Sequence, residues 1–291
     1  MYARINGADL FFDVEGSGYV PSGAQMLSKP TCFVLHGGPG SDHSYFKPWL
    51  TPLSESMQLV YVDHRGNGQS ERTGPATYKI EQMADDLEGL RRHLGLGRVV
   101  VFGNSFGGMV AQVYATRHPE SVEKLVLCTT APSADFWDEA QAMAERMATP
   151  EQKEVLTDLF EGRIKDEDEL EQWWRTCLPL YFHNKDEGIM EAFLGRVTAR
   201  LEVANYMMAN EIPDYDVRRG LPQVEAETLV IAGRHDWVTP VSQSQAIHDL
   251  LPNSRMVVYE DSGHMPFIEE QEEFNREVID FVFGGARAEA V

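Results

Sequence analysis

The chain has 291 residues, of which 43% are hydrophobic, and its formal net charge is −21 at pH 7. A chain of this length and composition can fill a sizeable core, either as one large domain or as a core with an insertion. The strongly negative charge argues against nucleic acid and anionic lipid as partners, because both would be repelled by it.

Cysteine usage and the first residues indicate the compartment. Cys32, Cys128 and Cys177 are scattered without a C-x-x-C spacing. An odd number of cysteines without a secretory signal predicts free thiols in a reducing environment. The first 16 residues contain no apolar signal core, and no stretch reaches the roughly 18 apolar residues of a membrane span. We therefore expect a soluble, cytoplasmic protein without a membrane partner; the oligomeric state is left open.

Continuous apolar runs along the chain predict strands that are buried on both faces, as in a parallel sheet. These runs are 31–37, 58–63, 98–104, 124–130, 228–233 and 255–261. Helical patterns lie between them at 78–96, 106–119, 241–252 and 272–283. This alternation predicts an α/β protein with a mostly parallel, doubly wound sheet. Segment 8–16 is expected to be an additional antiparallel strand, and 284–291 a frayed tail.

The strand–helix rhythm breaks between about 133 and 222, where the sequence is helix-rich, charged and aromatic. We therefore expect a first core part (1–132), a helical cap over the carboxyl edge of the sheet (133–222) and a second core part (223–291). Aromatic and methionine side chains of this cap are candidates for lining a pocket, the alternative being that they pack the cap's own core. They are Trp137, Trp173, Trp174, Tyr181, Phe182, Tyr206, Met207 and Met208.

A candidate nucleophile lies between a predicted strand and a predicted helix. Residues 103–107 read Gly-Asn-Ser-Phe-Gly and fit the pattern G-x-S-x-G. A sharp strand-to-helix turn pushes the serine out of the sheet edge, and small residues two positions before and two after it prevent collisions with neighbouring backbone. The helix behind the serine offers free N–H groups and a positive dipole end. This context predicts Ser105 as a nucleophile.

A serine hydroxyl needs a base, and the base needs an acid to orient it. His264 follows the last predicted strand, and Asp236 follows the strand before it. Both should therefore reach the sheet edge that carries Ser105. Asp236 could instead cap the helix that begins after Pro240. The triad is favoured because all three residues fall at strand ends, in the order that hydrolases use on this type of sheet.

The glycine-rich segment 36–40 (HGGPG) suits an oxyanion site. Acyl transfer places negative charge on a carbonyl oxygen, and two backbone N–H donors stabilise it. Phe106, directly after the nucleophile, is one expected donor. Gly38 is the other, because bare glycine exposes its amide and Pro39 stiffens the turn.

Other uses of these segments fail on the sequence. No G-K-[ST] follows for a phosphate loop, and GNSFGG at 103–108 lacks a good G-x-G-x-x-G register for a dinucleotide. His36 and His43 lack an H-E-x-x-H motif or an acidic third ligand. We therefore expect neither a metal nor a cofactor.

Five short segments together resemble the α/β-hydrolase fold, and most closely its proline iminopeptidase-like branch. They are HGGPG (36–40), DHRGNGQS (63–70), GNSFGG (103–108), GRHD (233–236) and SGH (262–264). The likeness covers 30–130 and 225–283 well, while the helical insertion matches only in position and rough size.

The resemblance implies a serine aminopeptidase that releases N-terminal proline from short peptides without a cofactor. It implies Ser105 as nucleophile, His264 as base and Asp236 as its orienter. It also implies Gly38 and Phe106 as the oxyanion donors. The turn with Asp63, Arg65, Gly66 and Gly68 is expected from the family to be a salt-bridged brace.

Recognition of a substrate ammonium would need negative groups, which the resembling family takes from its cap. Glu202 and Glu211 are the candidates in this sequence, with Trp137 and Tyr206 as further substrate contacts. The alternative for each glutamate is a solvated surface charge.

Two rival functions use the same core. The first is a carboxylesterase or lactonase that acts on small acyl esters with the same triad and an apolar cap pocket. The second is a ligand-binding protein without turnover, against which the intact triad argues. Haloalkane or epoxide hydrolysis would need a carboxylate in place of Ser105 and is discarded.

Overall fold

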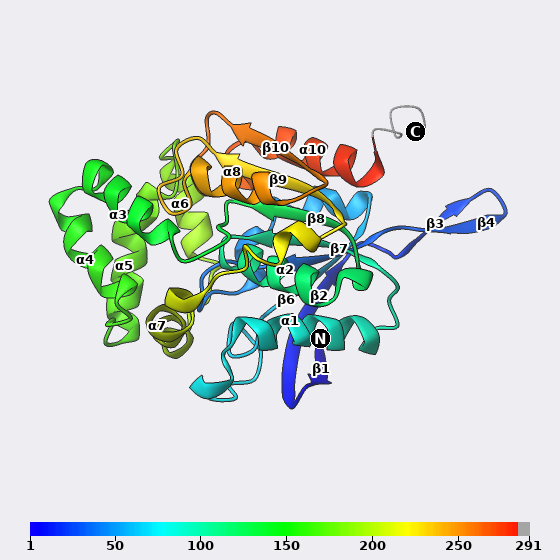
Figure 1. Cartoon of the computed structure of the whole chain (residues 1–291), viewed down its shortest axis with the longest axis horizontal. Helices are drawn as coiled ribbons and strands as arrows, with labels where there is room; N and C mark the ends of the chain where they lie inside the picture. The colour runs from blue at the N-terminus through cyan, green and yellow to red at the C-terminus, as the bar shows by residue number, and fades with distance from the viewer. Residues whose placement is uncertain (285–291) are drawn as a thin grey trace.

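An eight-stranded sheet forms the centre of the molecule (Figure 1). The computed structural model describes residues 1–284, except for the side chains of Leu159 and Phe160. Across the sheet the strands are β1 (Tyr2–Ile5), β2 (Ala8–Glu15), β6 (Gln58–Val62), β5 (Thr31–Leu35), β7 (Val99–Asn104), β8 (Val122–Cys128), β9 (Glu227–Gly233) and β10 (Ser254–Tyr259). The expected tail lies outside the described residues beyond Gly284.

Strands β6, β5, β7, β8, β9 and β10 pair in parallel, which confirms the prediction of a mostly parallel sheet. Strand β2 pairs antiparallel with β6, as expected for segment 8–16, and β1 adds a second antiparallel strand that was not predicted. The predicted core strands lie where expected, with their ends shifted by one or two residues. Their apolar runs are explained by burial on both faces: every residue of β7 is buried.

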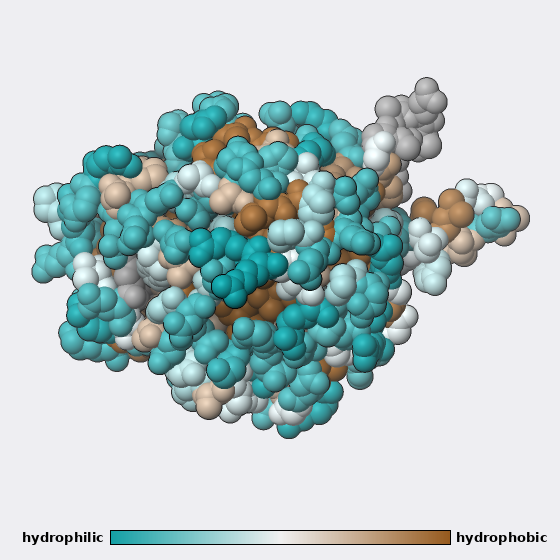
Figure 2. Space-filling view, in the orientation of Figure 1, coloured by the Kyte–Doolittle hydropathy of each residue, from teal (hydrophilic) through white to brown (hydrophobic). Residues whose placement is uncertain are grey.

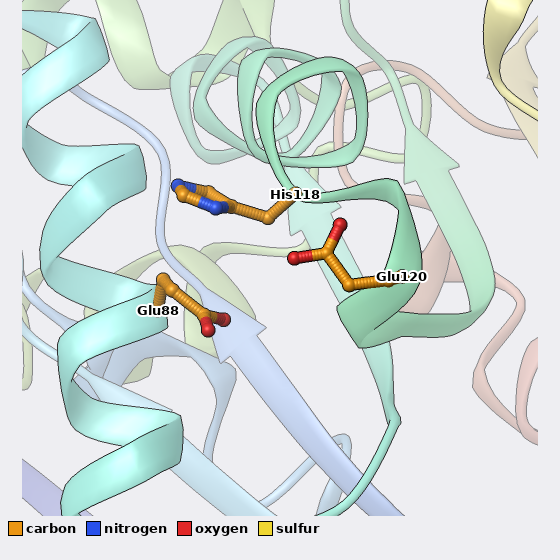
Figure 3. Close-up of side chains that lie close together, drawn as sticks. All are labelled: Glu88, His118 and Glu120. Atoms are coloured by element: carbon orange, nitrogen blue, oxygen red, sulfur yellow. The ribbon is translucent and has the colours of Figure 1, made fainter.

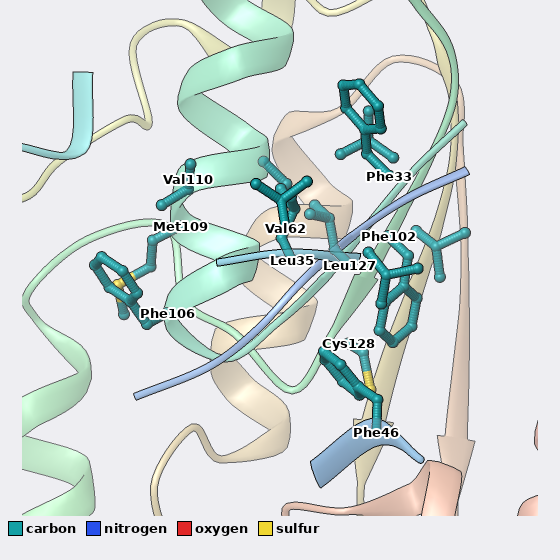
Figure 4. Packing of buried hydrophobic residues seen from close by; sticks show 14 of the residues in the cluster. Phe33, Leu35, Phe46, Val62, Phe102, Phe106, Met109, Val110, Leu127 and Cys128 are labelled. Atoms are coloured by element: carbon teal, nitrogen blue, oxygen red, sulfur yellow. The ribbon is translucent and has the colours of Figure 1, made fainter. Parts of the chain in front are cut away.

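Helices cover both faces of this sheet. They are α1 (Ile80–His93), α2 (Phe106–Arg117), α8 (Val241–Leu250), α9 (Pro266–Glu269) and α10 (Gln271–Phe283). Alternate residues of a strand point to opposite faces. Leu35, Val62 and Leu127 point toward α2, while Phe102 points toward Phe46 on the other side (Figure 4). Phe102 also packs edge-on against Phe274 of α10, with ring centroids 6.1 Å apart.

Five α-helices lie between β8 and β9 in the described residues. They are at the opposite end of the molecule from the hairpin of β3 (Tyr19–Ser22) and β4 (Gln25–Ser28) (Figure 1). They are α3 (Phe136–Met147), α4 (Pro150–Phe160), α5 (Glu167–Cys177), α6 (Glu187–Leu194) and α7 (Leu201–Asn210). Helix α5 begins after Asp166, whose carboxylate accepts a hydrogen bond from Glu169 N at 2.9 Å. An antiparallel bridge between Ser133 and Asp216 joins the two ends of this segment. The limits 133 and 222 of a separate cap stay a prediction.

The β3–β4 hairpin was not predicted from the sequence. All eight of its strand residues are exposed, and Gly23 allows the tight turn with a φ of 58°. Figure 2 shows apolar side chains on its projecting surface. Among the described residues, no helix combines the length and the apolar character needed to cross a lipid bilayer.

Candidate active site

Ser105 occupies a strained turn between β7 and α2. Its backbone has φ 54° and ψ −122°, in a region that L-residues rarely adopt. The turn is possible because the residues two positions before and two positions after Ser105 are glycines. A Cβ on Gly103 would lie 2.5 Å from the carbonyl oxygen of Gly107, and a Cβ on Gly107 would lie 2.2 Å from that of Leu35. The packing of α2 against the sheet therefore demands the spacing G-x-S-x-G.

His264 and Asp236 form a buried pair at the carboxyl ends of the last strands. The Nδ1 atom of His264 lies 2.8 Å from Oδ2 of Asp236, and the two side chains are 2% and 0% exposed. Asp236 also accepts hydrogen bonds at Oδ1 from the backbone N–H groups of Val238 and Thr239. The hydroxyl of Thr239 donates to Oδ2 at 2.8 Å. With Nδ1–H donating to the carboxylate, Nε2 of His264 is left as the acceptor.

A cavity of about 80 Å³ brings Ser105 and His264 together beneath the α3–α7 segment. Gly38 and Phe106 line the same cavity. Much of the rest of its wall is aromatic and comes from that segment: Phe136, Trp137, Trp173, Trp174, Tyr181 and Phe193. Within the described part of the chain, no aspartate, glutamate, lysine or arginine side chain lines this cavity.

The two expected oxyanion donors come from different kinds of backbone: Phe106 begins a helix, and Gly38 lies in the glycine-rich loop. Phe106 is the first residue of α2, and the first N–H groups of a helix have no partner within it. Gly38 has a φ of 117°, which favours glycine, and a Cβ there would lie 2.9 Å from Ser41 N.

The structure brings only one of the four expected substrate-binding residues, Trp137, to the cavity. The carboxylate of Glu202 instead accepts a hydrogen bond from the hydroxyl of Tyr78 at 3.1 Å. Glu211 lies 3.5 Å from the ammonium of Lys79. Tyr206 packs edge-on against Tyr78. In this structure the expected ammonium-binding carboxylates therefore do not reach Ser105.

The cavity includes lining residues that the sequence did not single out. Tyr45 and Asn104 contribute buried polar groups beside the glycine-rich segment. No local sequence pattern marks Tyr45, because its contact with Asn104 joins residues that are far apart in the sequence. Asn104 could have been found by its place directly before Ser105.

The histidines near the glycine-rich segments have internal partners. Burial lowers the pKa of His36, whose Nδ1 lies 2.7 Å from Gly37 O. Burial alone would also lower the pKa of His43, but the hydrogen bond and charge of Asp63 raise it overall.

The turn that contains Asp63, Arg65, Gly66 and Gly68 is held by a buried ion pair. Arg65 forms two hydrogen bonds, of 2.7 and 2.8 Å, to the carboxylate of Asp86 on α1.

A separate group of possible metal ligands lies between α1 and the connection from α2 to β8. Glu88, His118 and Glu120 face one another, with one ligand atom of each within 4.8 Å of the others (Figure 3). The carboxylate of Glu88 already binds the guanidinium groups of Arg91 and Arg92. We therefore interpret this group as part of an ion-pair network.

Glu269 ties the loop that carries His264 to the helical segment. Its Oε1 atom accepts backbone hydrogen bonds from His183 and Asn184 at 2.7 and 2.8 Å. Its Oε2 atom accepts one from Gly263, directly before His264, at 2.7 Å. Burial raises the pKa of Glu269 to about 7, although these three N–H groups act in the opposite direction.

The raised pKa predicts how Glu269 affects stability. Between its usual value of 4.5 and about 7, the folded chain binds more protons at this carboxyl than the unfolded chain does. Its contribution to the free energy of unfolding therefore falls as the pH rises through that window. Urea denaturation from pH 5 to 8 should show that the advantage of the wild type over Glu269→Gln shrinks with rising pH. A constant or growing advantage would contradict this, and exposed Glu272→Gln serves as the control.

Comparisons with known proteins give the same picture of the fold. Residues 30–271 match the α/β hydrolase fold family. Proline iminopeptidase PfmaB of Pestalotiopsis fici is 30% identical over 279 residues, covering 93% of this chain and 95% of that protein. A proline iminopeptidase of Lactobacillus helveticus is 30% identical over 263 residues, covering 86% and 88%. The solved esterase EaEST of Exiguobacterium antarcticum superposes with a TM-score of 0.75 at 24% identity, covering 97% and 98%.

Proposed function

Because the chain belongs to the α/β hydrolase family, in its proline iminopeptidase-like branch, and is a hydrolase, we propose that it cleaves its substrate through an acyl-enzyme on Ser105. The observation that carries this proposal is that His264, which pairs with the buried Asp236, lines the same cavity as Ser105.

In the proposed first step, Ser105 Oγ attacks the substrate's carbonyl carbon while His264 Nε2 takes the hydroxyl proton. Asp236 holds the tautomer that leaves Nε2 free and stabilises the imidazolium that forms. The negative charge on the carbonyl oxygen is met by the N–H groups of Gly38 and Phe106. The tetrahedral intermediate then expels the leaving group, which takes its proton from His264.

In the second step, water replaces the leaving group. His264 takes a proton from the water, whose oxygen attacks the acyl carbon. The same two N–H groups meet the returning negative charge. Collapse of the second intermediate breaks the bond to Ser105 Oγ, which regains its proton from His264, and releases the acid.

For the substrate, we propose an N-terminal prolyl group on a short peptide. The two relatives described above are named proline iminopeptidases. The apolar pyrrolidine ring of a prolyl group suits the largely aromatic wall of the cavity. In the structure, the aromatic rings would be the charge-attracting groups for its ammonium.

One observation favours a second candidate, a carboxylesterase or lactonase for small apolar acyl groups. The described lining of the cavity contains no carboxylate, and a neutral acyl group would not need one. This candidate uses the same steps at Ser105 and differs only in the substrate.

Three substrates separate the two candidates: prolyl p-nitroanilide, cyclopentanecarbonyl p-nitroanilide and p-nitrophenyl butyrate, each with Ser105→Ala as the blank. The cyclopentane ring matches proline in size but has no amine. Cation–π contacts of about 0.5–2 kcal/mol predict that kcat/KM is about 2- to 30-fold higher for the prolyl anilide. Ester cleavage without Ser105-dependent anilide cleavage would instead establish the second candidate. A prolyl preference above about 100-fold would mean that a carboxylate such as Glu202 reaches the site during turnover.

A further inference from the structure

A chain of buried hydrogen bonds lies behind Ser105 and connects three loops of the site. The backbone N–H of Gly37 donates to the hydroxyl of Tyr45 at 2.6 Å. That hydroxyl donates to Oδ1 of Asn104 at 2.8 Å. The Nδ2 group of Asn104 donates to Oγ1 of Thr129 at 2.8 Å, and Thr129 donates to the carbonyl oxygen of His264 at 3.1 Å.

Donors and acceptors follow one order along these hydrogen bonds. A backbone N–H can only donate, so the Tyr45 oxygen accepts from Gly37, and the Tyr45 hydroxyl donates to Oδ1 of Asn104. Asn104 then turns its oxygen to Tyr45 and its amino group to Thr129. The hydroxyl of Thr129 donates to His264 O at 3.1 Å and also lies 3.7 Å from Sγ of Cys128, a weaker acceptor. Burial raises the pKa of Tyr45, so the phenol keeps the proton that this order requires.

The three side chains that form these hydrogen bonds are almost fully buried. Tyr45 is 2% exposed, Asn104 is 1% exposed and Thr129 is fully buried. Hydrogen bonds in such surroundings strengthen one another, and a partner left unsatisfied costs more than it would at the surface. The members of the chain should therefore hold their relative positions rigidly.

Both ends of the chain are next to groups of the proposed mechanism. Gly37 precedes Gly38, and a Cβ on Gly37 would lie 3.0 Å from Cβ of Ser105. Asn104 directly precedes Ser105 in the sequence. At the other end of the hydrogen-bond chain, Thr129 binds the backbone carbonyl of His264. The oxyanion loop, the nucleophile and the base are therefore tied to one another through a single set of side chains.

We propose that Tyr45, Asn104 and Thr129 are positioning residues, which set the oxyanion loop and the His264 loop in register with Ser105. This inference rests on the proposed acyl-enzyme function. It concerns kcat more than substrate binding, because the chain fixes the groups that act in the transition state. A displacement of about 1 Å at such groups can lower the rate about 100-fold.

Tyr45→Phe tests the proposal, since it removes the hydroxyl and keeps the ring that packs against Phe46 and Phe193. We expect kcat per active site to fall about 10- to 100-fold, with KM changed less than about threefold. Active sites are counted by fluorophosphonate titration, so that misfolded molecules do not enter kcat. Tyr114→Phe is the matched control, because it removes another buried hydroxyl, bonded to Glu88 near the end of α2, and should leave kcat unchanged.

Thr129→Val breaks the chain at its other end while keeping the shape of the side chain. We expect kcat to fall about tenfold, and the double variant with Tyr45→Phe to lose much less than the product of the two single losses. Such non-additivity is the sign of residues that act as a unit.

The outcomes separate this inference from the proposed function. If Ser105→Ala is inactive while Tyr45→Phe and Thr129→Val both keep kcat within twofold of wild type, the positioning role is overturned and the acyl-enzyme stands. Fully multiplicative losses in the double variant would also overturn it. If Tyr45→Phe does not fold, Thr129→Val alone decides. Activity that survives in Ser105→Ala would overturn the proposed function instead.

Discussion

Ser105→Ala is expected to lower turnover about 10⁶-fold while leaving the free energy of unfolding nearly unchanged. The substitution removes only Oγ, the atom proposed to form the acyl bond, and keeps the backbone of the strained turn. Purified variant and wild type are compared by kcat on the better of the substrates above, and by urea denaturation.

Ser244→Ala is the control for this experiment. Ser244 is a buried serine of α8 outside the cavity lining, so its substitution should leave turnover unchanged. Turnover of Ser105→Ala within about 100-fold of wild type, in a preparation free of wild-type enzyme, would refute Ser105 as the nucleophile.

Asp236→Asn is expected to lower kcat about 10⁴-fold through the tautomer of His264. Two backbone N–H groups point at Oδ1 of Asp236, so the amide oxygen of asparagine must take that place. The amide NH₂ then faces Nδ1 of His264, which must become the acceptor. The proton moves to Nε2, and the imidazole can no longer accept the proton of Ser105.

The asparagine variant is measured at several pH values, with exposed Asp214→Asn as the control. Folding should be retained, because aspartate and asparagine have nearly the same shape. A loss of less than about tenfold would show that the Asp236 carboxylate does not determine the tautomer of His264.

The sheet could be predicted from the sequence because its signals are local. Apolar runs mark strands buried on both faces, and Ser105, Asp236 and His264 each follow such a run. Because parallel strands end at one edge, their positions along the chain were enough to expect them at one site. The exposed β3–β4 hairpin lacks such a signal, since neither of its strands is covered.

The residues of α7 that line the cavity were not predictable in the same way. Glu202 and Tyr206 lie four residues apart and contact Tyr78, whereas Ala204 and Met208 line the cavity. The helical period shows which residues share a face. It does not show which face turns to the site, because that depends on packing against distant parts of the chain. Tyr45 was not predicted either, because its place at the site also depends on packing against residues far away in the sequence.

The most direct test of Ser105 as the nucleophile is the mass spectrum of the protein after reaction with a fluorophosphonate, followed by peptide mapping. We expect one adduct per chain, on the peptide that contains Ser105, and no adduct on Ser105→Ala. An adduct at another residue, or an active enzyme that stays unlabelled, would contradict the proposed mechanism.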